Sequence, residues 1–184
     1  MESKPHRPTA TEASAALLDA EVARARLADH IVTPSWFFAS IGVAIAVQIA
    51  TTAAGLGGDA PRLIAGGLAV FAAVAGIQLA RFRRANGVWL GGFASRVVLG
   101  TATAASVTYA LALAAAIWAA YGDRWWLMAL WSAVGGAAYA LSGGRWMQSY
   151  RGDPAAHARG ESLAWLALML AAGISGLVVL VLNA

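Results

Sequence analysis

The sequence predicts an all-α integral membrane protein, a bundle of five transmembrane helices preceded by a cytoplasmic N-terminal amphipathic helix. Of its 184 residues, 60% are hydrophobic and only 12% are charged, and the mean hydropathy is +0.65. Soluble domains carry about 25% charged residues. Five apolar stretches of roughly 20 residues contain no Asp, Glu, Lys, Arg or His, and each is long enough to cross a hydrocarbon core about 30 Å thick. These patterns exclude a soluble globular fold, a coiled-coil rod and a disordered chain.

A polar head precedes the first apolar stretch. Residues 1–8 are expected to form a disordered tail, and residues 9–33 a cytoplasmic helix. Thr9 and Glu12 have the spacing of a capping box, in which each side chain accepts a hydrogen bond from the other residue's backbone N–H. This pair therefore predicts where the helix begins.

The helix is expected to run from Ala10 to about Val32, because this stretch contains neither glycine nor proline. Pro34 should end it, since a residue that precedes a proline avoids the α region. An apolar stripe follows one side of the helix, and we expect lipid or the basic loop at 81–96 to cover it. The stripe consists of Leu17, Ala20, Leu27 and Ile31.

The membrane domain is expected at residues 34–184. Between the third and fourth spans only Tyr121 to Trp125 breaks the apolar pattern, and this segment must be a tight turn because a fused helix would far exceed the bilayer. The five spans are predicted at about 36–56, 63–80, 97–120, 125–143 and 162–182.

The basic residues predict how the chain is threaded. Of the 13 Lys and Arg residues, all but Arg62 and Arg124 lie in the head or in the connections that follow the second and fourth spans. Short cytoplasmic loops carry the excess of Lys and Arg. The chain is therefore expected to be a multi-pass protein of the cytoplasmic (inner) membrane, with its N-terminus in the cytoplasm and Ala184 outside.

Aromatic residues near the ends of the spans are expected to form belts at the two membrane–water interfaces. One group opens the first span, a second surrounds the outer turn, and a third lies near the other inner ends. They are Trp36, Phe37 and Phe38; Trp118, Tyr121, Trp125 and Trp126; and Trp146, Tyr150 and Trp165.

Little in the sequence points to catalysis or to a cofactor. There is no cysteine, so disulfides, thiolate nucleophiles and Cys-ligated metals are excluded. No span contains a histidine, which excludes bis-histidine haem ligation within the bundle. No hydrolase, nucleotide or zinc-protease motif is present, and the basic segments are too short to form a nucleic-acid surface. We therefore expect no enzyme activity, no cofactor, no metal and no nucleic-acid partner.

Three polar residues are the candidates for function inside the membrane: Gln48, Gln78 and Thr108. A buried amide needs a hydrogen-bond partner, and the two glutamines lie at different depths, so they are not expected to pair with each other. Thr108 could line a crevice, although Ser and Thr in membrane helices commonly bond to the preceding turn or to a neighbouring helix.

Two further groups are candidate contact residues. Arg81, Arg83, Arg84 and Arg96 form a basic loop that either meets anionic lipid headgroups or docks a soluble partner. Ala133, Gly136 and Ala140 place small side chains on the fourth span, where they would let a neighbouring helix approach closely.

One combination of features resembles a known group of sequences. It consists of the Arg-containing N-terminal helix, the Pro34, Trp36 and Phe37 cluster that opens the first span, and a basic loop with Gly87 and Val88. In these features the chain is similar to uncharacterised small multi-pass membrane proteins of high-GC bacteria. The resemblance implies no activity.

Two functions are compatible with these features. The first is an accessory or regulatory membrane subunit that acts through helix packing and partner interactions, either with a membrane-protein partner or with copies of itself. The second is a small oligomeric transporter or channel for an uncharged or small solute. Transporters usually keep ionisable residues at membrane depth, and the predicted spans contain none, which favours the first function.

Overall fold

The computed structural model describes residues 9–87, 94, 98 and 104–153, and the five helices in these segments are accompanied by no strand. The prediction of an all-α chain is confirmed for this part of the protein. The predicted tail at 1–8, the start of the third span and the fifth span at 162–182 lie outside the described residues. The helices are α1 (Ala10–Asp29), α2 (Phe37–Gly57), α3 (Pro61–Asn86), α4 (Ala104–Tyr121) and α5 (Trp125–Gly152).

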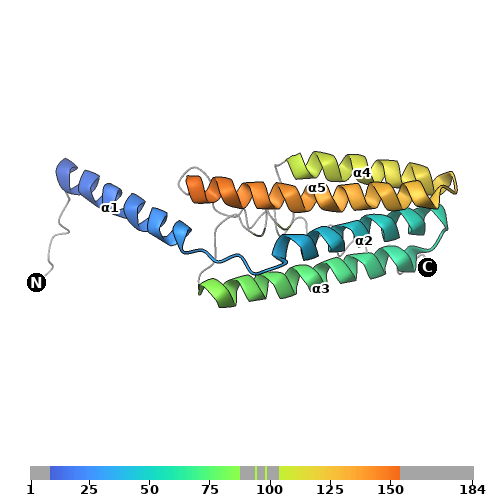
Figure 1. Ribbon diagram of the computed structural model, residues 1–184, viewed down its shortest axis with the longest axis horizontal. Helices are drawn as coiled ribbons and strands as arrows, with labels where there is room; N and C mark the ends of the chain where they lie inside the picture. Colours follow the sequence, from blue (N-terminus) through green and yellow to red (C-terminus); the bar gives the residue numbers. More distant parts are fainter. Residues whose placement is uncertain (1–8, 88–93, 95–97, 99–103, 154–184) are drawn as a thin grey trace, which may run out of the picture.

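Helices α2 to α5 lie side by side, and each runs antiparallel to the helix before it (Figure 1). Helix α2 packs against α3, α4 and α5, and α4 also packs against α5. Helix α1 points away from one end of this bundle (Figure 1). Two of the helices, α2 and α3, are long and apolar enough to cross a membrane, and α4 contains a shorter apolar segment.

Short turns impose the antiparallel order. Between α2 and α3 the N–H of Ala60 donates to the carbonyl of Gly55 (2.8 Å), and Pro61 occupies the first turn of α3, where its missing N–H is not needed. Between α4 and α5 the N–H of Arg124 donates to the carbonyl of Ala119 (2.9 Å). The tight turn predicted from Tyr121 to Trp125 is confirmed.

Two helices continue beyond the predicted spans. Helix α3 ends at Asn86 and α5 at Gly152, whereas the predicted spans ended near 80 and 143. Hydropathy identifies only the apolar part of a helix. The backbone hydrogen bonds of α3 and α5 continue past that part into polar residues, so the helices are longer than the predicted spans.

The capping box at the start of α1 is also confirmed. The N–H of Thr9 donates to Oε2 of Glu12 (2.7 Å), and the N–H of Glu12 donates to Oγ1 of Thr9 (3.3 Å). The helix ends at Asp29, before the predicted Val32. It ends early because the N–H of Ile31 turns back to the carbonyl of Ala28 (3.3 Å).

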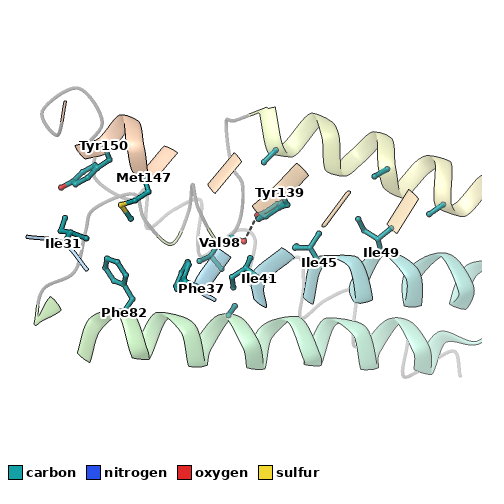
Figure 2. Packing of buried hydrophobic residues seen from close by; sticks show 14 of the residues in the cluster. Ile31, Phe37, Ile41, Ile45, Ile49, Phe82, Val98, Tyr139, Met147 and Tyr150 are labelled. Carbon is teal, nitrogen blue, oxygen red and sulfur yellow. Dashed lines mark hydrogen bonds between the residues drawn. The ribbon is translucent and has the colours of Figure 1, made fainter. Parts of the chain in front are cut away.

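Two aromatic residues expected at the interface lie in the core instead. Phe37 is buried in contact with Phe38 and Phe82, at ring-centroid distances of 5.3 and 6.2 Å. Tyr150 is buried and stacks on Trp146. Figure 2 shows Phe37, Phe82 and Tyr150 with Ile31 and Met147 at the end of the bundle next to α1. These rings close that end of the bundle, and their burial corrects the interface assignment.

Trp36 immediately precedes Phe37 and has the opposite environment. Its side chain is 80% exposed, and its φ of 64° lies in the left-handed region, which costs a non-glycine residue about 1–2 kcal/mol. This conformation turns the chain so that Phe37 enters the core while the indole of Trp36 points outward.

The bundle carries many large apolar side chains on its outer surface in addition to those in its core, which is unusual for a soluble protein. Gln48, Gln78 and Ser132 are buried. Helices α2 to α5 contain no acidic residue, and their arginines lie near the helix ends. Exposed apolar side chains follow the helices along their length, among them Val43, Val70, Ile77, Val107, Leu111, Leu130 and Leu141.

Candidate functional site

A polar cluster joins α2 to α4 inside the bundle. The hydroxyl of Tyr109 donates to Oε1 of Gln48 (2.7 Å), and Nε2 of Gln48 donates to Oγ1 of Thr52 (3.1 Å). Gln48 is 7% exposed. The amide that was expected to need a partner therefore has two, one on its own helix and one 61 residues further along the chain.

The other candidate intramembrane residues do not join this cluster by any described hydrogen bond. Gln78 is buried on α3, and among the described residues its Oε1 has no hydrogen-bond partner. Thr108 is half-buried next to Tyr109. As predicted, the two glutamines do not pair. Sequence reasoning singled out Thr108 and overlooked Tyr109, whose long side chain reaches α2.

A second tyrosine adds a polar link within the bundle. The hydroxyl of Tyr139 on α5 donates to the backbone carbonyl of Val98 (2.7 Å) (Figure 2). Ser132, also on α5, donates to the carbonyl of Met128 one turn earlier (2.7 Å). Every group in these interactions is neutral, so the interior described here is suited to joining helices and offers no charged side chain for acid–base chemistry.

The candidate packing residues on α5 divide between two environments. A Cβ placed on Gly136 would collide with the carbonyl oxygen of Gly42 and would lie 2.8 Å from Cβ of Ala46. A Cβ on Gly42 would lie 2.9 Å from Cβ of Ala140. Gly136 and Ala140 thus lie at the contact with α2, whereas Ala133 is exposed.

The candidate arginines lie near the end of the bundle from which α1 extends. Arg81, Arg83 and Arg84 occupy the last turns of α3 and are exposed. Arg96 lies outside the described residues. The opposite end has a balanced pair of charges in each turn, Asp59 with Arg62 and Asp123 with Arg124.

Two side chains tie the segment between α1 and α2 to this end of the bundle. Asn86 bonds both backbone groups of Val32: its Oδ1 accepts from the N–H (2.8 Å) and its Nδ2 donates to the carbonyl (2.9 Å). Nη2 of Arg151 donates to the carbonyl of Ile31 (2.9 Å) and to Oγ1 of Thr33 (3.4 Å). The ends of α3 and α5 therefore fix the chain where it leaves α1.

Sequence reasoning did not identify this junction. Asn86 also donates to the carbonyl of Phe82 (2.9 Å), and Gly87 adopts a left-handed φ of 66°. An Asn-Gly pair after a basic turn is a signal for the end of a helix. The signal was present, but it gives no indication that Asn86 bonds a segment 54 residues earlier.

Among the described residues, burial near the junction is confined to the C-terminal part of α1 and the segment that follows it. Ala28 and Ile31 are buried. Closer to the N-terminus, Leu17, Leu18 and Val22 are 66, 62 and 49% exposed. Leu18 and Val22 are four residues apart and lie on one face of the helix, with Leu17 beside them. This part of α1 extends beyond the end of the bundle (Figure 1).

No family model matches the chain, and neither the curated proteins nor the solved structures include a match to it.

Proposed function

We propose that the chain is a multi-pass protein of the inner membrane that acts as an accessory or regulatory subunit, through helix packing and through a partner that binds α1. The observation that carries this proposal is the contrast along α1. The segment that follows its C-terminal end is fixed to the bundle by Asn86 and Arg151, while Leu17 and Leu18 remain exposed beyond the bundle.

The apolar outer surface of the bundle supports its placement in a membrane. Contact with water is unfavourable for the exposed Leu, Val and Ile side chains along α2 to α5, whereas contact with the hydrocarbon of a bilayer is not. The exposed rings of Trp118, Tyr121, Trp125 and Trp126 gather near the α4–α5 turn, as expected at a membrane–water interface. In this proposal the predicted fifth span, 162–182, completes the bundle.

The arginines support the orientation. Arg81, Arg83, Arg84, Arg145 and Arg151 lie toward the α1 end of the bundle, which by the positive-inside rule faces the cytoplasm. Helix α1 then projects into the cytoplasm. Its four acidic residues outnumber its two arginines, so an anionic membrane surface does not attract it. A protein partner is the better cover for Leu17, Leu18 and Val22.

Site-specific photocrosslinking in native membranes tests this function. A photoreactive residue at Leu17, Leu18 or Val22 should form adducts with the same protein at all three positions. That protein should also copurify with the chain in a fixed molar ratio. The matched controls are Ala16 and Ala23, which are also exposed and lie on the other side of α1. If the apolar positions crosslink no better than these controls, α1 is not a docking helix and the proposal fails.

The polar cluster favours a second candidate, a small oligomeric transporter or channel for an uncharged or small solute. Gln48, Thr52 and Tyr109 place hydrogen-bonding groups within an apolar bundle. Solute flux in liposomes distinguishes the two functions. A transporter would lose flux in the variants Gln48→Leu and Thr108→Val while its fold remained intact, and would copurify as a homo-oligomer without another protein.

A further inference from the structure

An exposed apolar stripe on α3 ends in two arginines. Leu63, Val70 and Ile77 recur every seven residues and are 46, 46 and 58% exposed. Arg81 and Arg84 follow Ile77 by four and seven residues, so they continue the same helix face. From Leu63 to Ile77 the stripe covers 15 residues, which corresponds to about 21 Å along a helix.

The charge at the end of this stripe is not compensated by the helix. Helix α3 contains no acidic residue. Both Arg81 and Arg84 are exposed, and among the described residues neither makes a hydrogen bond or an ion pair with another side chain. Arg83 has the same charge and exposure, but it lies on a different face of the helix.

An anionic phospholipid matches this arrangement in both of its parts. Guanidinium groups bind phosphate oxygens through paired, charge-assisted hydrogen bonds. Acyl chains would lie along Leu63, Val70 and Ile77, as the chains of a bilayer lie along a spanning helix. Free phosphate or a nucleic acid would use the arginines and leave the apolar stripe uncovered.

We infer that Arg81 and Arg84 form a binding site for the headgroup phosphate of an anionic phospholipid whose acyl chains pack on the outward face of α3. This inference rests on the proposed function, because it requires α3 to span the membrane with its Arg84 end at the cytoplasmic leaflet. It goes beyond a general attraction of basic loops to anionic lipid, since it assigns the site to one face of one helix.

Lipid titration of the purified full chain in a neutral detergent tests the site. The probes are phosphatidylglycerol, phosphatidylcholine with the same acyl chains, and inorganic phosphate, and the readout is the midpoint of thermal unfolding together with native mass spectra of lipid-bound protein. Phosphatidylglycerol should raise the midpoint in a saturable manner, and the other two probes should not.

Matched variants separate a specific site from diffuse charge. Arg81→Gln and Arg84→Gln should each weaken phosphatidylglycerol binding several-fold, and together by on the order of tenfold or more. Arg83→Gln and Arg62→Gln should leave binding within about twofold of the parent, because each removes one positive charge from a position that lies outside the stripe. Equal binding of phosphatidylcholine, an equal effect of inorganic phosphate, or an equal loss in Arg83→Gln would overturn the inference.

Failure of this inference is distinguishable from failure of the proposed function. If the protein is extracted from membranes by alkaline carbonate without detergent, it does not span the bilayer, and both proposals fall. If it resists extraction but binds both phospholipids equally, only the Arg81–Arg84 site is wrong.

Discussion

The backbone of Gly136 in α5 lies directly against the backbone of Gly42 in α2. A Cβ on Gly42 would lie 2.7 Å from the carbonyl oxygen of Gly136, closer than real Cβ contacts allow. Between helices in lipid, close packing of this kind is the main attractive force. The contact makes the two glycines the most restrictive positions for added volume between α2 and α5.

We expect Gly136→Leu to force α5 away from α2 and to lower the stability of the fold by about 1–3 kcal/mol or more, because a packed interface tolerates added volume poorly. Gly136→Ala should act in the same direction with a smaller effect. Thermal unfolding in detergent measures both changes.

Gly144, two turns further along α5, is the matched control. Apart from the adjacent backbone of α5, no atom of the described residues lies within 4 Å of a Cβ built there, and alanine is favoured over glycine in a helix by about 1 kcal/mol. Gly144→Ala should therefore leave the unfolding midpoint unchanged or raise it. A Gly136→Leu protein as stable as the parent would show that this face of α5 does not pack against α2.

Tyr109→Phe should destabilise the bundle by about 1 kcal/mol, because it removes the hydroxyl that satisfies the buried Oε1 of Gln48. The substitution keeps the ring and its packing. Tyr121→Phe is the control, since Tyr121 is exposed in the turn. In a double-mutant cycle, Gln48→Leu should make the Tyr109→Phe change almost neutral, and strict additivity of the two losses would show that the hydrogen bond contributes nothing.

Asn86→Leu should release the segment between α1 and α2. It removes two hydrogen bonds to Val32 and one to the carbonyl of Phe82, each with a net contribution of about 1 kcal/mol. Hydrogen exchange at the amide of Val32 should become faster while exchange in α2 remains slow. Asn86→Asp keeps the acceptor for the Val32 N–H and should show an intermediate rate, and unchanged exchange in both variants would contradict the role assigned to Asn86.

Thr9→Ala should fray the start of α1, since the Thr9 side chain accepts the Glu12 N–H and a lost N-cap costs about 1 kcal/mol. Thr11→Ala is the control, because it makes the same exchange at a nearby exposed threonine that is not part of the capping box. Spin labels at Ser14 should gain mobility in the first variant and not in the second. Equal mobility in both would show that the capping box does not set the start of the helix.

The features that could be predicted from the sequence are those that depend on residues close together in the chain. The capping box of Thr9 and Glu12 and the turn between Tyr121 and Trp125 depend on spacing over a few residues, and both are present. Hydropathy located α2 closely. It located α3 and α5 but not their full extent, because a helix continues past its apolar segment wherever its backbone remains hydrogen-bonded.

The features that could not be predicted depend on contacts between distant segments. The sequence indicated that Gln48 needs a partner, yet the partner is Tyr109 on another helix. Trp36 and Phe37 are adjacent aromatic residues with opposite environments, because the left-handed backbone at Trp36 turns the chain before α2 begins. The bonds from Asn86 and Arg151 to residues 31–33 join segments that no local pattern relates.

Single-cysteine labelling of the full chain in intact cells tests the membrane placement most directly, because the sequence contains no cysteine. Three positions are needed: Ser14 in α1, Val70 midway along α3 and Gly122 in the α4–α5 turn. With a membrane-impermeant maleimide we expect Gly122→Cys to react in intact cells, Ser14→Cys only after permeabilisation, and Val70→Cys in neither case, although its side chain is 46% exposed on the protein surface. Rapid labelling of Val70→Cys would show that this face of α3 is in water and would contradict a membrane-spanning bundle.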